Sequence, residues 1–86
     1  MRCRAAYQRP RPQKLATKLV EIRKHLGLSQ NEIIRELGLQ GELVRSEISA
    51  FEGEVREPPY LVLLAYAKLA NTSTDVLIDD TLRLNL

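Results

Sequence analysis

Residues 26–52 read LGLSQNEIIRELGLQGELVRSEISAFE, and this stretch decides the fold. Ser29 is followed three residues later by Glu32, which is the spacing of a capping box at the start of a helix. Apolar residues at helical spacing predict a short helix over 30–37, and Gly38 ends it. The Gly-Leu pair that follows indicates a turn, so the stretch predicts two short helices in succession.

The second helix of this pair is predicted over 43–52. Val44, Ile48 and Phe51 are spaced four and three residues apart, which places them on one apolar face. Gly53 closes the helix.

Helical periodicity continues on both sides of this pair. Four leucines and isoleucines spaced four, three and four residues apart predict a first helix over 13–26. A pair of prolines indicates the start of a fourth helix over 59–70. Asn71 is typical of a helix C-cap, and Ser73 is typical of the N-cap of a short fifth helix. Five helices joined by short turns predict an all-α fold.

Length and composition restrict the class of protein. The chain has 86 residues, 44% hydrophobic and 28% charged, which fits one globular domain. No apolar run approaches the roughly 20 residues that span a bilayer, so we expect a cytoplasmic protein without a membrane partner. Cys3 is the only cysteine and allows neither an internal disulfide nor a cysteine-based zinc site.

The sequence offers no residues for catalysis. His25 is the only histidine, and it has no cysteine or carboxylate at metal-ligand spacing. Asp79 and Asp80 are adjacent and have no partner base or nucleophile, so we expect a solvated chain end there. Glycine-rich phosphate loops of the Walker or dinucleotide type do not occur. We therefore predict that the protein is not an enzyme and needs no cofactor or metal.

The positive charge is concentrated at the N-terminus. Arg2, Arg4, Arg9 and Arg11 precede residue 12 without an acid, whereas nine basic residues face eleven acids from residue 13 onward. This division predicts a flexible basic arm over 1–12, a helical domain over 13–78 and a tail over 79–86. The arm suits contacts with DNA phosphates or the minor groove, and a solvated tail without a role is the alternative.

The ordered set of signals resembles the lambda-repressor-like, Xre/Cro-type helix-turn-helix family over about residues 13–78. The resemblance rests on three segments, on the proline-led fourth helix and on residues 71–77. The segments are Leu26-Gly27-Leu28-Ser29-Gln30, Leu37-Gly38-Leu39 and Ile48-Ser49-Ala50-Phe51-Glu52. The resemblance implies a regulator of transcription that binds double-stranded DNA, with its third helix in the major groove.

This resemblance assigns two groups of residues to DNA. The candidates for reading bases lie on the third helix, where a bidentate guanidinium, two hydroxyls and a methyl group suit base edges: they are Arg45, Ser46, Ser49 and Ala50. The candidates for binding phosphates lie at the start of the second helix, in the loop after the third and in the arm: they are Gln30, Asn31, Arg56, Arg9 and Arg11.

Three departures from the family pattern bear on this assignment. About four additional residues lie between Gly38 and Ile48, which predicts a lengthened turn before the recognition helix. Ile34 stands where the family usually has alanine, so the second and third helices are expected to pack differently. The third helix is rich in acids, and Glu54 stands where the family has glycine. Glu52 matches the family and is interpreted as a structural acid.

The predicted fourth helix is apolar on all sides, and only Lys68 is charged. We expect one stripe to face the core: Tyr60, Leu63, Leu64, Ala67 and Ala70. We expect the opposite side to form a twofold homodimer interface: Leu61, Val62, Ala65, Tyr66 and Leu69. The alternatives are that the tail, with Leu82, Leu84 and Leu86 alternating with polar residues, folds over this face or pairs across the dimer.

These observations favour a repressor that reads a palindromic operator as a dimer, with half-sites about one helical turn apart. One alternative is an antitoxin of the same fold that also grips a toxin through the fourth helix or the tail. Another is a protein-interaction module that has lost DNA binding, which the acidic third helix favours.

Overall fold

The computed structural model describes residues 11–86, and these residues form five helices. The helices are α1 (Leu15–His25), α2 (Gln30–Glu36), α3 (Arg45–Glu52), α4 (Tyr60–Leu69) and α5 (Thr74–Ile78). The all-α prediction is confirmed, and each of the first four helices begins and ends within two residues of its predicted bounds. None of the helices in the described part of the chain is long and apolar enough to cross a membrane.

The helix ends follow the signals in the sequence. Ser29 Oγ accepts from the Glu32 amide at 3.1 Å, and the Glu32 carboxylate accepts from the Ser29 amide at 2.7 Å, so the predicted capping box is present. Ser73 Oγ caps α5 through the Val76 amide. Asn71 lies just beyond α4 with φ 56°, the left-handed conformation expected of it.

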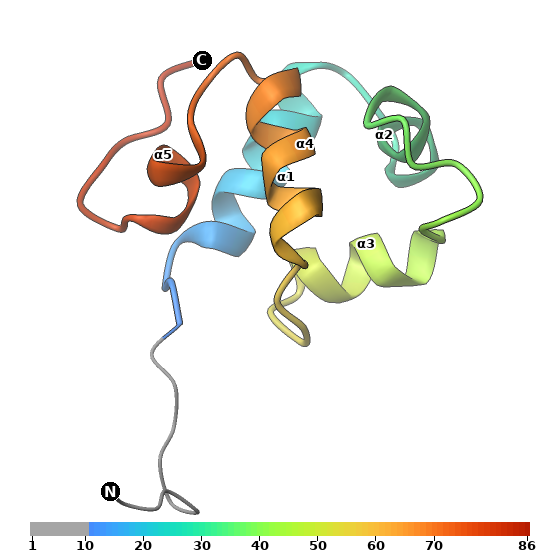
Figure 1. The fold of residues 1–86 in the computed structure, drawn as a ribbon, viewed down its shortest axis with the longest axis horizontal. Coiled ribbons are helices and arrows are strands. Elements are labelled where there is room, and N and C mark those ends of the chain that lie inside the picture. Colours follow the sequence, from blue (N-terminus) through green and yellow to red (C-terminus); the bar gives the residue numbers. More distant parts are fainter. Residues whose placement is uncertain (1–10) are drawn as a thin grey trace, which may run out of the picture.

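The helices surround one core (Figure 1), to which every helix contributes. Helix α3 contacts both α1 and α2, while α4 contacts α5 and α5 contacts α1. The side chains with no exposed surface come from all five helices: they are Leu19, Ile22, Ile33, Ile48, Tyr66 and Leu77. Because α3 is packed on its inner side only, its outer side lies at the edge of the molecule.

The connection between α2 and α3 is long, as predicted, and contains a closed turn. The Leu39 carbonyl accepts from the amides of Glu42 and Leu43, both at 3.0 Å. This turn carries Leu43 into the same core cluster as Ile34. The prediction that Val44 faces the core is wrong: it is 59% exposed, because it precedes α3 in an extended conformation and Leu43 enters the core in its place.

The inward face predicted for α4 is correct for Ala67, which is buried, and for Leu63 and Ala70, which pack against the core, but it is wrong for Tyr60 and Leu64. Val62, Tyr66 and Ala67 are buried, whereas Tyr60 is 80% exposed and Leu64 is 40% exposed. The helix is rotated relative to the prediction because nearly all its positions are apolar, so periodicity gives no contrast between its faces.

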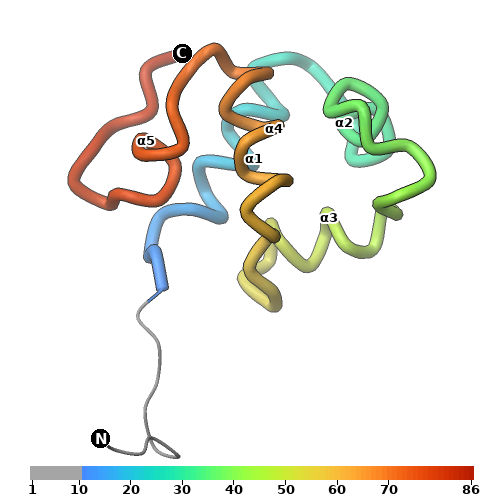
Figure 2. The backbone as a smooth tube through the Cα atoms, in the orientation of Figure 1, coloured from blue at the N-terminus to red at the C-terminus, as the bar shows by residue number. Residues whose placement is uncertain are grey.

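The tail packs against α1, as the tube in Figure 2 shows at the side of the molecule away from α2 and α3. Lys18 of α1 is 4% exposed, and its ammonium donates to the carbonyls of Val76, Asp79 and Leu82 at 2.6, 3.1 and 3.0 Å. The alternative that the tail folds over α4 is therefore wrong. Asp80 is not a free chain end either.

Candidate nucleic-acid interface

Helix α3 presents a polar outer face. Its inner face buries Ile48 and Phe51 against α1 and α2. The side chains of Arg45, Ser46 and Ser49 are exposed. All four predicted base-reading residues are thus on α3; three are exposed, and the fourth, Ala50, is half-buried.

Arg45 lies at the first position of α3, and within residues 11–86 it makes no ion pair. The residue before it, Val44, donates its amide to the Glu47 carboxylate at 3.0 Å. This contact reaches back over the first turn of α3 and satisfies an amide at the helix start. The guanidinium of Arg45 is consequently available to a ligand at the helix N-terminus.

A partly buried ion pair fixes α3 to α1. Arg23 Nε and Nη2 donate to the two carboxylate oxygens of Glu52 at 2.7 and 3.0 Å, and Nη1 donates to the Leu28 carbonyl at 3.0 Å. Hydrogen bonding to Glu52 raises the pKa of Arg23 above its ordinary value, although burial opposes the shift. The two parallel bonds restrict the angle between the helices as well as their separation. Glu52 is a structural acid, as its place in the sequence indicates.

Gln30 at the start of α2 joins this network. Its Nε2 donates to Glu52 Oε1 at 3.1 Å, and its side chain is half-buried. Nearby, the Tyr66 hydroxyl is buried without a hydrogen-bond partner among the described residues, and burial raises its pKa. The side chain of Gln30, which is predicted to contact a phosphate, is therefore held by a hydrogen bond to Glu52. Its neighbour Asn31 is exposed.

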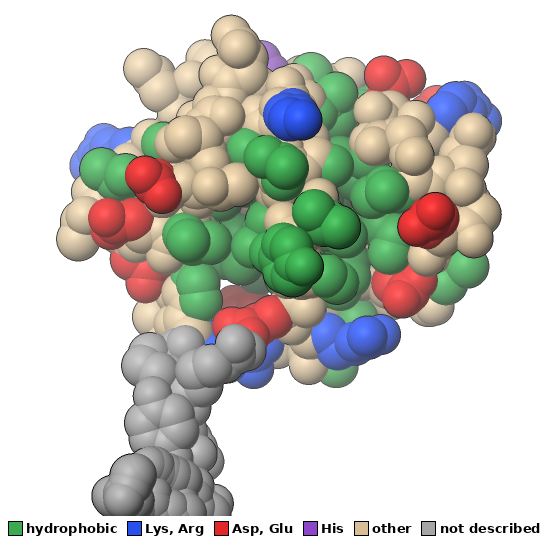
Figure 3. Space-filling model, viewed as in Figure 1, with side chains coloured by type: hydrophobic (Ala, Val, Ile, Leu, Met, Phe, Trp, Pro, Cys, Tyr) green, Lys and Arg blue, Asp and Glu red, His purple; other side chains and the backbone are tan. Residues whose placement is uncertain are grey.

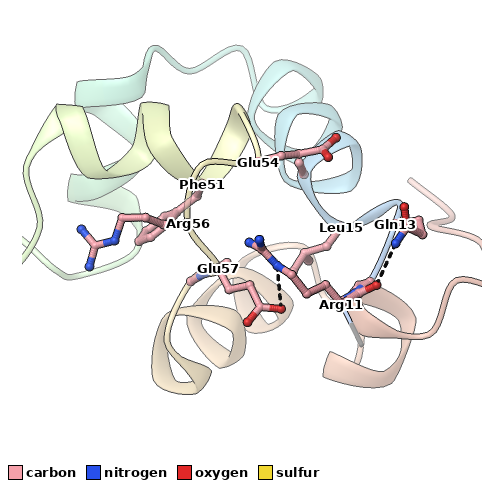
Figure 4. Close-up of a pocket in the computed structure, with 10 residues that line it drawn as sticks. Arg11, Gln13, Leu15, Phe51, Glu54, Arg56 and Glu57 are labelled. Atoms are coloured by element: carbon pink, nitrogen blue, oxygen red, sulfur yellow. Dashed lines mark hydrogen bonds and ion pairs between the residues drawn. The ribbon is translucent and has the colours of Figure 1, made fainter. Parts of the chain in front are cut away.

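The remaining phosphate candidates lie beside the loop after α3 and around a pocket next to it (Figure 4). Arg11 points into the pocket, where its Nε lies 3.4 Å from Glu57 Oε2. Arg56 extends away from Arg11, and its side chain is 59% exposed. Its Nη1 lies 3.8 Å from Glu47 Oε2. The structure thus separates these two arginines instead of joining them in one cluster. Arg9 lies outside the described residues.

Two of the acids of α3 have structural partners: Glu47 reaches the start of the helix, and Glu52 binds Arg23. Glu54 adopts φ 64°, in the left-handed region that favours glycine. The glycine of the family pattern is therefore replaced by a glutamate in the backbone conformation that suits glycine.

The predicted dimer residues separate into two sets. Val62 and Tyr66 are buried inside one chain, so they cannot contact a partner. Leu61 is 63% exposed, and Ala65 and Leu69 are half-buried. The accessible surface of α4 also includes Tyr60 and Leu64, which the sequence had placed in the core.

Sequence reasoning missed the contacts that fix the ends of α1. Asp80 accepts from the amides of Gln13 and Lys14 at 2.8 and 3.0 Å, which occupies the N-terminus of α1 and lowers the pKa of the Asp80 carboxyl. The available signal was Lys18, a charged residue three positions after Leu15 and therefore on the apolar side of the helix.

A family model described as a helix-turn-helix domain matches residues 16–82. Neither a curated protein nor a solved structure matches the chain. The match covers all five helices except the first residue of α1, and it includes the first part of the tail and the α2–α3 pair with its exposed polar face. The chain therefore belongs to the helix-turn-helix domain family.

Proposed function

We propose that this protein is a sequence-specific transcriptional regulator of the lambda-repressor-like, Xre/Cro type, which reads a palindromic operator as a dimer and acts as a repressor. The observation that carries the proposal is the outer face of α3, where polar side chains are exposed at the edge of a helix-turn-helix pair. A major groove about 12 Å wide admits one helix, and its base edges offer donors and acceptors to such side chains.

The side chains on α3 fit different parts of this task. Arg45 suits the O6 and N7 acceptors of a guanine, which a guanidinium can bind with two parallel hydrogen bonds. Ser46 and Ser49 can donate or accept a hydrogen bond. Ala50, half-buried at the edge of the same face, can meet a thymine methyl group.

The buried contacts behind α3 support this role. Arg23 and Glu52 hold α3 at a fixed angle to α1, and Gln30 connects the start of α2 to the same carboxylate. A reader helix held on a rigid scaffold loses little conformational entropy when it enters the groove. We propose that Gln30, Asn31 and Arg56 position the domain on phosphates, and that Arg9 and Arg11 extend this contact along the DNA.

We infer repression because occupancy of an operator is sufficient to exclude polymerase, whereas activation needs a further contact surface. A reporter with a selected site overlapping its promoter tests this step. Expression should fall when the protein is produced, and a rise in expression would refute repression.

The direct test is a salt titration of binding to random and selected duplex DNA. We expect log K to fall with log salt at a slope near −0.9 per phosphate contact, and the selected site to gain at least about a thousandfold. Arg45→Ala should reduce the preference for the selected site by roughly ten- to a hundredfold. Arg83→Ala removes another exposed arginine, in the tail, and should leave that preference unchanged. Equal losses on all sequences for Arg45→Ala would refute the reading role.

A second candidate function, an antitoxin or a protein-interaction module, is favoured by one observation. The outer face of α4 is apolar and exposed, and acids lie around α3. Such a protein would use α4 to bind a protein partner. Absence of any DNA binding at low salt would favour the protein-interaction module over the first function. An antitoxin would still bind its operator and would in addition bind a protein partner through α4.

A further inference from the structure

Helix α4 carries an exposed apolar surface on the face of the molecule seen in Figure 3. Hydrophobic side chains gather there over α4 and toward α2. Tyr60, Leu61 and Leu64 are 80%, 63% and 40% exposed. Contiguous apolar surface of this kind is rare on a monomer and marks a contact with another molecule.

No described segment of the chain covers this surface. Leu84 and Leu86 of the tail lie beside Val20 and Lys24 of α1. Lys18 holds the carbonyl of Leu82 at 3.0 Å, which ties the tail to that side of the molecule. The tail is therefore committed elsewhere, and the α4 surface is open.

The surface contains a groove between the end of α2 and nearly the whole length of α4. Its apolar lining consists of Leu37 from α2 and of Leu61, Leu64, Ala65 and Leu69 from α4. Glu36 stands on the α2 wall and Lys68 on the α4 wall. Neither of these two charged residues makes an ion pair within residues 11–86.

The placement of these two opposite charges suits a twofold contact. In an isologous interface, each residue of a patch meets the residue on the opposite side of the same patch in the partner. A groove with an acid on one wall and a base on the other is thus complementary to its own copy. A partner of unrelated sequence has no need of this arrangement.

We propose that this groove is the site of self-association, where the apolar wall of α4 seats against the groove of a second copy. Glu36 of each chain then faces Lys68 of the other, and the two ion pairs form at the rim of an apolar centre. The proposal rests on the dimeric mode of operator binding proposed above. In the dimer interface predicted from the sequence, it replaces the buried Val62 and Tyr66 by Leu37, Leu64 and the two charged residues.

Charge reversal tests the pairing without DNA. We expect Lys68→Glu and Glu36→Lys each to weaken the dimer by roughly tenfold or more, because each single change puts two like-charged pairs in contact. The double variant should regain wild-type association. A mixture of the two single variants should form heterodimers, because each charge then meets its opposite. Sedimentation velocity at low salt measures all four.

Matched controls separate pairing from general charge effects. Lys24→Glu and Glu21→Lys reverse exposed charges on α1, outside the groove, and should dimerise as the wild type does. Leu64→Asp should abolish the dimer, whereas Leu86→Asp, at a leucine that is 47% exposed in the tail, should not. Circular dichroism confirms that each variant is folded before it is compared.

The proposal is overturned if the wild-type chain is monomeric at about 100 µM, if either single reversal dimerises normally, or if the mixed variants stay apart. The experiments can refute this proposal and the proposed function independently of each other. A dimer that binds no DNA would leave the groove assignment standing and remove the regulator, while a DNA-binding monomer would do the reverse.

Discussion

Replacement of Lys18 by methionine tests how strongly the tail is tied to α1. Methionine keeps most of the aliphatic stem in the same buried position and removes the ammonium. Three backbone carbonyls, those of Val76, Asp79 and Leu82, then lose their charged donor.

The magnitude follows from these three bonds. A hydrogen bond to a charged group contributes about 1.5–3 kcal/mol, but the neighbouring Asp79 and Leu82 are exposed enough for water to replace part of the loss. The apolar methionine recovers some desolvation energy of the buried ammonium. We therefore expect the free energy of unfolding to fall by about 2–4 kcal/mol. For a domain of this size, that lowers Tm by at least about 8 °C.

Urea unfolding followed by far-ultraviolet circular dichroism measures the change in the free energy of unfolding. Lys24→Met, at an exposed position of the same helix, is the matched control and should lie within about 0.5 kcal/mol of the wild type. Hydrogen exchange should accelerate at the Leu82 amide, which bonds to the Asp79 carbonyl. A Lys18→Met protein as stable as the control variant would show that the three bonds only offset the burial of the charge.

Three further predictions concern stability. Glu54→Gly should raise the free energy of unfolding by about 0.5–1 kcal/mol, because φ 64° favours glycine. Glu54→Gln removes the charge without relieving the backbone and should give no gain in urea unfolding. Glu52→Gln should cost about 2–3 kcal/mol in the same assay, since it leaves Arg23 buried beside a neutral group, and replacing both residues with leucine and methionine should recover part of this loss. Hydrogen bonds from two backbone amides lower the pKa of Asp80 in the folded protein, so its stabilising effect is present above the unfolded pKa of about 4 and is lost as the pH falls through the folded value. The difference in stability between wild type and Asp80→Asn, measured by urea unfolding at a series of pH values, should therefore shrink as the pH falls below about 4.

Local signals in the sequence were sufficient to predict the helices and their ends. The capping box at Ser29, the left-handed Asn71 and the Ser73 cap each depend on residues within a few positions of one another, so they can be read without knowledge of the tertiary structure. The position of the exposed outer face of α3 followed from the spacing of the buried Ile48 and Phe51. The prediction that Val44 faces the core was wrong because α3 begins one residue later, at Arg45, so helical periodicity does not apply to Val44.

Contacts between distant parts of the chain could not be predicted in the same way. The bonds of Lys18 connect residues 58 to 64 positions apart, and no pattern in the sequence specifies which carbonyls an ammonium will find. The rotation of α4 was also undetermined, since Tyr60 and Tyr66 have the same chemistry and yet are 80% and 0% exposed. Packing of α4 against the other helices decides between them: Tyr66 lies near Arg23 of α1 and Glu52 of α3, and such contacts are not visible in one helix alone.

The hydrogen bonds between α1 and the tail also determine when α1 can become fixed during synthesis. Helix α1 leaves the ribosome early, but its N-terminal amides and the ammonium of Lys18 have no partners until residues 76–82 have emerged. During that interval the ammonium of Lys18 on the apolar side of α1 has no partner. Burial of this side of the helix is then disfavoured, because it would bury an unpaired charge. Residues 76–82 must therefore have left the ribosome before the first helix is locked, and a ribosome that stalls earlier holds a chain in which α1 still lacks its partners.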